Sequence, residues 1–207
     1  MITTVRALCR CQPDYAPAWF ESWYNAGWRP ILTREEDCRR HPDFALWQAT
    51  VADLPFVNQR DYSEWSYFRW LGHGDEPCAM VDLDTINYGW RPEDYAALNI
   101  PAGKILFLDE VDLVGDPEQV RRERFAAIAR AEPFIEPDGR PNLSDMVTMR
   151  AVHPGNIMTA ISKQLLDPGW EQAALVHFQN DRWRRMGATS RLDAIRTVNA
   201  MRKENGK

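Results

Sequence analysis

Two aspartates separated by one residue, Asp82 and Asp84, are the sharpest chemical signal in the sequence. They end the apolar run Cys78–Asp84, which is typical of a buried strand, and ligands of open α/β sheets bind at the carboxyl ends of strands. Two carboxylates this close repel each other unless a cation lies between them or one is protonated. Mg²⁺ and Mn²⁺ take oxygen ligands and commonly bridge carboxylates to phosphates. The pattern predicts a metal site, although such a pair can also simply end a strand at a turn.

A histidine late in the chain, His177, lies near the end of a second apolar run, Ala173–Phe178. Neutral imidazole is a common metal ligand. A single histidine in such a run is more often a structural residue, but the Asp82–Asp84 pair favours the metal interpretation. We therefore expect His177 to be the third ligand, with its side chain close to both aspartates.

Arginines flank both motifs. Arg69 belongs to a predicted helix, Asp61–Leu71, that leads into the strand before Asp82, and Arg60 directly precedes this helix. The planar guanidinium group suits phosphate oxygens, because it donates two parallel hydrogen bonds. Arg69 can equally be a surface ion-pair residue. A basic run that could hold a diphosphate follows His177 closely and contains Arg182, Arg184 and Arg185.

The order of these motifs resembles a known family. A Ser-Tyr-x-Arg helix ending at Arg69, a strand ending in Asp-x-Asp, a later acidic segment and a His-Phe pair followed by a basic residue and Trp occur in that order. This is similar to the A-type fold of nucleotide-sugar-dependent glycosyltransferases, above all the small retaining enzymes that transfer galactose or glucose. The resemblance runs from Thr3 to about Met186. It implies a Rossmann-like α/β domain and, as donor, a nucleoside-diphosphate sugar, most often a UDP-sugar.

The resemblance also implies roles for individual residues. Asp82, Asp84 and His177 would hold Mn²⁺ or Mg²⁺ against the donor diphosphate. Asp145 would touch the donor sugar or the acceptor, as the acidic residue of its family segment does. The family has Lys before Pro-Trp after the histidine, whereas this chain has Asp-Arg-Trp, so the basic ligand of the leaving diphosphate stays open. The donor-binding candidates are Arg60, Asp61, Arg69, Arg182, Arg184 and Arg185.

The elements that must position these residues alternate between strand and helix patterns. We expect one α/β domain with a mainly parallel mixed sheet flanked by helices over residues 1–186, and a basic helical segment over 187–207. Four cysteines without a paired metal-ligand spacing are expected to be free, mostly buried thiols. The expected strands are Thr3–Leu8, Arg29–Thr33, Phe56–Val57, Cys78–Asp84, Lys104–Asp109 and Ala173–Phe178. The expected helices are Ala16–Ala26, Asp61–Leu71, Gln119–Ala131, Ser144–Met149, Ile157–Leu166 and Arg191–Lys203.

The charge and the hydropathy of the chain limit the classes of partner that it can bind. The 207 residues carry a net charge of −5, but the segment from Asp181 to Lys207 holds eight Lys/Arg against three Asp/Glu. The acidic remainder argues against general nucleic-acid binding, whereas the basic terminal helix permits an anionic acceptor or surface. No apolar run approaches the roughly 18 residues of a membrane span, and no signal peptide precedes the first strand. We therefore expect a cytoplasmic protein with no integral membrane segment.

Three function classes remain at this stage. The first is a metal-dependent glycosyltransferase whose acceptor is a glycan, a lipid-linked sugar or a modified DNA base. The second is a nucleotidyl- or phosphotransferase that uses the same acidic pair for Mg²⁺. The third is a non-catalytic binding module on the same fold. The released product separates the first two, because glycosyl transfer frees a nucleoside diphosphate and nucleotidyl transfer frees pyrophosphate.

Overall fold

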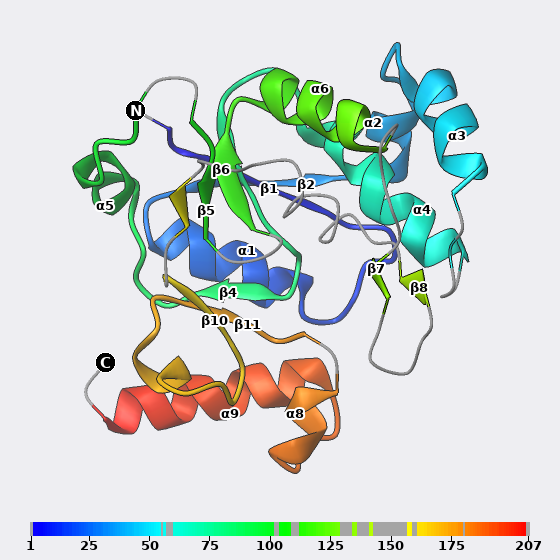
Figure 1. The fold of residues 1–207 in the computed structure, drawn as a ribbon. Helices are drawn as coiled ribbons and strands as arrows, with labels where there is room; N and C mark the ends of the chain where they lie inside the picture. Colours follow the sequence, from blue (N-terminus) through cyan, green and yellow to red (C-terminus); the bar gives the residue numbers. More distant parts are fainter. Residues whose placement is uncertain are drawn as a thin grey trace.

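The computed structural model describes residues 2–54, 56, 60–101, 104–108, 112–128, 134–135, 141–142, 157–158, 161–179 and 181–205. Within these ranges the chain is an α/β protein with mixed sheets flanked by helices (Figure 1). No helix among the described residues is both long and apolar enough to cross a membrane.

The larger sheet has six strands in the order β2-β1-β3-β6-β5-β9. Strand β1 is parallel to β2 and β3, whereas β6 is antiparallel to both β3 and β5, and β9 is parallel to β5. The expectation of a mainly parallel sheet was therefore wrong. The connection from β5 to β6 is only five residues long, and a parallel connection needs a crossover of about a dozen or more. The strands are β1 (Thr4–Leu8), β2 (Arg29–Thr33), β3 (Cys78–Met80), β5 (Leu106–Phe107), β6 (Leu113–Gly115) and β9 (Ile157–Met158).

Side chains point alternately to the two faces of this sheet, and described residues of its strands contribute to two separate core clusters. Ala79 contributes to a core cluster that includes Trp19 and Trp23 of helix α1 (Ala16–Asn25). Cys78 and Met80 point to a second cluster, built with residues of the helices on the other face. Gly27, with a φ of +89°, follows α1 in the left-handed conformation predicted for the end of that helix.

The second sheet has three strands, in the order β10 (Ser162–Gln164), β11 (Leu175–His177) and β4 (Thr85–Asn87). Strand β11 runs parallel to β10 and antiparallel to β4. The helix expected over Ile157–Leu166 was wrong, since β9 and β10 lie there. A short apolar run does not distinguish a buried strand from a helix, which explains the error.

The C-terminal helix α9 (Arg191–Glu204) lies beneath the second sheet (Figure 1). Ser190 caps its start, because its side chain accepts a hydrogen bond from the Asp193 amide. Ile195 and Val198 are fully buried, whereas Met201, three residues after Val198, is 39% exposed.

The other helices and short strands complete the fold. The expected helix at Asp61–Leu71 is α-helical only to Phe68 and continues as a 3₁₀ turn from Arg69. The expected helix at Ser144–Met149, and with it Asp145, lies outside the described residues. The remaining elements are α2 (Glu35–Arg39), α3 (Phe44–Ala52), α4 (Arg60–Phe68), η1 (Arg69–His73), α5 (Pro92–Ala97), α6 (Pro117–Ile128), β7 (Phe134–Ile135), β8 (Pro141–Asn142), η2 (Trp170–Gln172) and α8 (Arg182–Arg185).

Candidate metal centre

Asp82, Asp84 and His177 converge as predicted from the sequence. One ligand atom from each residue lies within 4.8 Å of the others. The His177 Nε2 atom is 3.1 Å from Asp84 Oδ1 and 3.5 Å from Asp82 Oδ2. His177 is fully buried, and its ring presents one nitrogen to both carboxylates.

Strand pairing brings the histidine to the aspartates. His177 pairs with Thr85 across β11 and β4, so its side chain lies beside the turn that precedes β4. That turn spans residues 82–85 and is closed by a 3.0 Å hydrogen bond from the Thr85 amide to the Asp82 carbonyl. The Phe178 amide donates to the Asp84 carbonyl at 2.9 Å. The two acids therefore lie on a turn between two short strands, and the strand expected to run to Asp84 ends at Met80.

A buried carboxylate, Asp112, holds this turn in place. It accepts a 2.7 Å hydrogen bond from the Asp82 amide and a 2.6 Å bond from the Thr85 hydroxyl. Asp112 has no exposed surface. Asp112 was not predicted from the sequence, because an acid just before a short apolar run cannot be told from an ordinary loop residue until the pairing of the strands is known.

Two arginines contact the acidic pair, one at each aspartate. Arg69 donates to Asp82 Oδ1 and therefore lies beside the cluster. Arg191 Nη2 is 3.3 Å from Asp84 Oδ2, and its Nη1 donates to the Tyr15 hydroxyl at 2.8 Å. Sequence reasoning gave Arg191 no role here, since it is distant in sequence and begins a helix that was expected to face an acceptor.

The surroundings of Asp82 keep it ionised. Burial raises the pKa of this carboxyl, but the charge of Arg69 and a hydrogen bond from His177 outweigh burial and hold its pKa well below the usual range. Tyr15 behaves differently, because burial raises the pKa of its phenol. The site therefore presents an anionic ligand at Asp82 and a neutral hydroxyl at Tyr15.

The donor set fits a divalent cation. Each aspartate gives one oxygen to an arginine and turns the other toward His177 Nε2. One imidazole nitrogen with two carboxylate oxygens suits an ion such as Mn²⁺, and carboxylates alone also suit Mg²⁺. Asp82, Asp84 and His177 are the residues that would hold it.

A cavity of about 700 Å³ opens beside this cluster, at the carboxyl ends of β1 and β3. Its volume falls in the range of about 300–1,000 Å³ that is usual for small-molecule sites. Arg10 lies in its wall and forms ion pairs with Glu35 at 2.8 Å and with the exposed Asp61 at 2.7 Å. Its described lining also includes Leu8, Cys11, Pro13, Tyr15, Tyr62, Trp65, Ser66, Arg69, Asp82, Leu83, Asp84, His177, Gln179 and Arg191.

The other candidates on α4 do not line this cavity among the described residues. Arg60 forms an ion pair with Glu64 at 3.0 Å and donates to the Ala52 carbonyl. Asp61 reaches the site only through Arg10. Trp65 and Phe68 are buried, as predicted for core residues, although Trp65 also borders the cavity.

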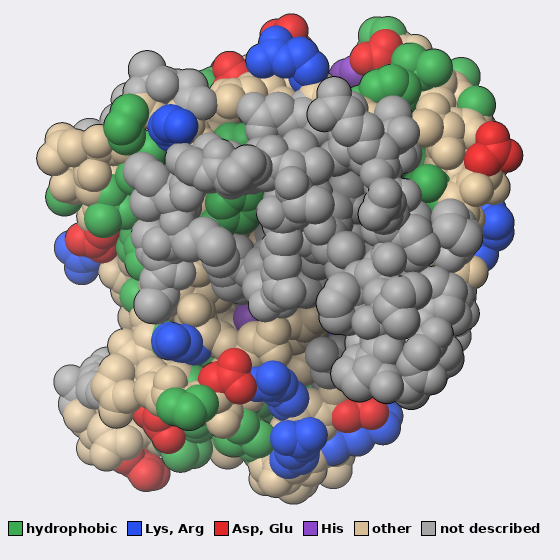
Figure 2. All heavy atoms as spheres, in the orientation of Figure 1, with side chains coloured by type: hydrophobic (Ala, Val, Ile, Leu, Met, Phe, Trp, Pro, Cys, Tyr) green, Lys and Arg blue, Asp and Glu red, His purple; other side chains and the backbone are tan. Residues whose placement is uncertain are grey.

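The basic run on α8 also lies outside the described lining of the cavity. Arg182 is bonded to Asp167 and to the Leu165 carbonyl, and Arg184 forms an ion pair with Asp181 at 3.3 Å. Arg185 is exposed. Figure 2 shows basic side chains at the bottom of the molecule, where Figure 1 places α8 and α9, mixed with acidic ones.

Three comparisons, with family models, with curated proteins and with solved structures, found no match to this chain. The site therefore rests on its own geometry, which is a cluster of two carboxylates and one imidazole, flanked by two arginines at the mouth of a cavity.

Proposed function

We propose that this chain is a divalent-metal-dependent glycosyltransferase whose donor is a nucleoside-diphosphate sugar. The observation that carries the proposal is the convergence of Asp82, Asp84 and His177 beside a cavity that also contains Arg69 and Arg191. The choice of glycosyl transfer comes from the sequence resemblance. The parallel strands β2-β1-β3 suit the Rossmann-like A-type fold that the proposal includes.

The charges of the centre explain why the donor would carry a diphosphate. Two carboxylates already face two guanidinium groups, so these four side chains sum to zero. A divalent cation held there gives the site a charge of about +2. This excess complements a diphosphate, whose oxygens can complete the coordination shell of the cation.

The side chains of the site have different roles in the proposed reaction. When bound, the ion supplies Lewis-acid neutralisation of the charge that develops on the departing nucleoside diphosphate. Arg69 and Arg191 add hydrogen bonds and positive charge at the same oxygens. Asp112 keeps the turn of residues 82–85 rigid, so that both aspartates stay in position. Asp145 remains our candidate for contact with the donor sugar or the acceptor.

Fewer of the basic residues near the C-terminus keep the roles that were proposed from the sequence. Arg182 is engaged by Asp167, so Arg191 replaces the α8 arginines as our first choice for the leaving diphosphate. The exposed Arg196 and Lys203 on α9 face solvent and remain candidates for an anionic acceptor or surface.

The test is product analysis with a panel of UDP- and GDP-sugars in the presence of Mn²⁺. We expect at least one donor to bind in a metal-dependent manner and to release a nucleoside diphosphate. Asp84→Asn should lose this binding, whereas Asp53→Asn, an exposed carboxylate at the end of α3, should retain it. Release of pyrophosphate would indicate a nucleotidyltransferase instead. Equal binding of the donor in EDTA would refute the metal assignment.

A further inference from the structure

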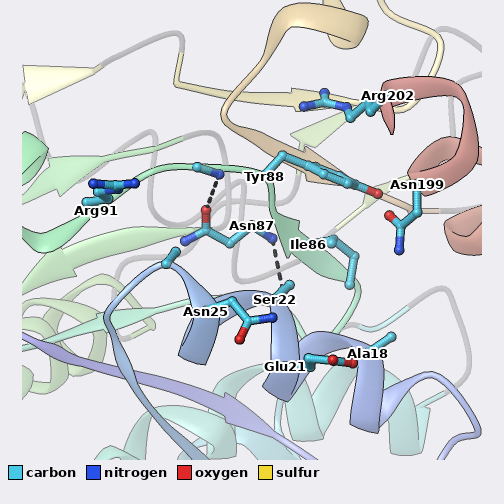
Figure 3. Close-up of a pocket in the computed structure, with 12 residues that line it drawn as sticks. Ala18, Glu21, Ser22, Asn25, Ile86, Asn87, Tyr88, Arg91, Asn199 and Arg202 are labelled. Carbon is cyan, nitrogen blue, oxygen red and sulfur yellow. Dashed lines mark hydrogen bonds between the residues drawn. The ribbon is translucent and has the colours of Figure 1, made fainter. Parts of the chain in front are cut away.

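A second cavity, of about 460 Å³, lies between α1, β4 and α9 (Figure 3). It shares no described lining residue with the metal cavity. Along α9, Arg191 touches the metal cluster and Asn199 lines the second cavity eight residues later, about 12 Å away at roughly 1.5 Å per residue. The described lining comprises Ala18, Glu21, Ser22, Asn25, Ala26, Ile86, Asn87, Tyr88, Gly89, Arg91, Asn199 and Arg202.

The floor of this cavity is held rigidly by hydrogen bonds within the protein. The Asn87 side-chain oxygen accepts from the amides of Gly89 and Trp90 at 2.9 and 2.8 Å, and its nitrogen donates to the Trp90 carbonyl. The Asn87 amide donates to Ser22 Oγ on α1 at 3.2 Å. Because these groups are already satisfied, the floor has a fixed shape before any ligand arrives.

The rim carries polar groups without partners. Glu21 and Asn25 project from α1 and Asn199 from α9, and all three residues are exposed (Figure 3). Among the described residues, no hydrogen bond or ion pair joins their side chains to the protein. The Tyr88 hydroxyl is buried beside them and has no hydrogen-bond partner within the part of the chain that the structure describes. The lining thus offers one exposed carboxylate, two exposed carboxamides and the exposed Arg91 guanidinium, with the buried Tyr88 hydroxyl beside them.

Tyr88 is fixed from behind by Arg202. The Arg202 guanidinium lies 4.0 Å from the centre of the Tyr88 ring, and Figure 3 shows it on the side of the ring away from α1. Its Nη2 donates to the carbonyls of Trp170 and Ala173, and the residue is only 9% exposed. The tyrosine ring is therefore a rigid wall of the cavity, with its orientation set by the protein.

We propose that this cavity binds a carbohydrate, at a site separate from the metal centre. Carboxylate and carboxamide groups accept from and donate to neighbouring hydroxyls, and an aromatic ring packs against the C–H face of a sugar. A phosphorylated ligand would meet the Glu21 carboxylate as well as the Arg91 guanidinium, so the charge of the lining does not favour it. A flat base needs only one aromatic face for stacking, so it would compete with a sugar for Tyr88, the one aromatic side chain in the described lining, whose other face Arg202 covers. Adenosine is therefore included in the test.

The experiment measures binding of methyl glucoside, methyl galactoside, methyl mannoside and N-acetylglucosamine by saturation-transfer NMR, with adenosine as a competitor class. We expect at least one sugar to bind at millimolar concentration. Glu21→Gln should weaken it about tenfold and Asn199→Ala about fivefold, as expected for loss of a charged and a neutral hydrogen bond. Tyr88→Phe should weaken binding without lowering the melting temperature, because the hydroxyl it removes has no hydrogen-bond partner among the described residues. Glu204→Gln, an exposed acid on the same helix, is the matched control and should bind normally.

The same measurement separates this site from the proposed transferase centre. Sugar binding should persist in EDTA and in Asp84→Asn, whatever the outcome of the donor experiment. Loss of binding under either condition would assign the sugar to the metal cavity and overturn the proposal. It is also overturned if none of the four sugars binds, if adenosine binds in preference to them, or if Glu21→Gln and Asn199→Ala leave the affinity unchanged.

Discussion

Replacing Arg191 by methionine should move two affinities in opposite directions. The substitution keeps a flexible side chain of similar reach and removes the charge that lies 3.3 Å from Asp84 Oδ2. Burial lowers the pKa of this guanidinium, but Asp84 and Tyr15 raise the pKa by more than burial lowers it. The pKa therefore lies above its usual value, and the charge is permanent. Without it, the centre gains one net negative charge. We expect Arg191→Met to bind Mn²⁺ more tightly and a nucleoside diphosphate with Mn²⁺ less tightly.

The size of the effect follows from the exposure of the pair. Two unit charges about 4 Å apart interact by about 1 kcal/mol in bulk water and by about 4 kcal/mol at an effective dielectric constant of 20. The Arg191 side chain is 26% exposed and the Asp84 side chain 13%, so solvent screens the interaction in part. We therefore expect about 1–2 kcal/mol, roughly a five- to thirtyfold change in each dissociation constant.

Isothermal titration calorimetry measures both quantities on the same variant, first with MnCl₂ alone and then with UDP at saturating Mn²⁺. Tyr15→Phe is the matched comparison, because it removes the hydrogen bond to Arg191 and leaves the charge. A parallel loss of metal and diphosphate binding in Arg191→Met would refute the electrostatic reasoning. It would show that Arg191 acts by holding Asp84 in position.

Three further predictions address the metal, the turn and the thiols. Mn²⁺ at a hundred times its dissociation constant should stabilise the wild type by about 2.7 kcal/mol, roughly 5–10 °C in melting temperature, and Asp84→Asn should abolish the shift. Asp112→Ala should lower the free energy of unfolding in urea by about 3–5 kcal/mol, because two buried donors lose a charged acceptor; a loss under about 1 kcal/mol would contradict this. Iodoacetamide should label the exposed Cys11 in the folded protein but not Cys38 or Cys78, because burial raises the pKa of both of these thiols to about 12. Mass spectrometry detects the adducts, and labelling of either buried thiol would contradict the burial assignment.

Local sequence patterns predicted those helices and strands whose bounds are set by residues close together in the chain. Strand β2 spans Arg29–Thr33 as expected, and α1 begins at Ala16 and is followed by the left-handed Gly27. The metal cluster was also predictable, because Asp82, Asp84 and His177 each follow or end an apolar run. The rule that strand ends gather at one edge of a sheet does not explain how the three residues meet, because the two acids lie on the turn between β3 and β4, whereas His177 belongs to the second sheet, on a strand antiparallel to β4.

The residues that sequence reasoning missed depend on pairing between distant segments. Asp112 reaches the turn of residues 82–85 only because β6 lies beside β3 in an antiparallel register. Arg191 reaches Asp84 only because α9 packs under the second sheet. Neither pairing leaves a periodic signal in the chain, so neither residue could be separated from an ordinary surface acid or a helical arginine.

Helix α9 connects the two proposed sites through one rigid element. Its first residue, Arg191, contacts Asp84 at the metal cluster, and Arg202, eleven residues later, supports Tyr88 in the second cavity. Between them, Ile195 and Val198 are fully buried in the core, which fixes the helix against the sheet. A boundary at residue 187 would therefore separate an aspartate of the metal cluster from the arginine that neutralises it. The basic character of this segment has two origins, since Arg191 and Arg202 serve the interior whereas Arg196 and Lys203 face solvent.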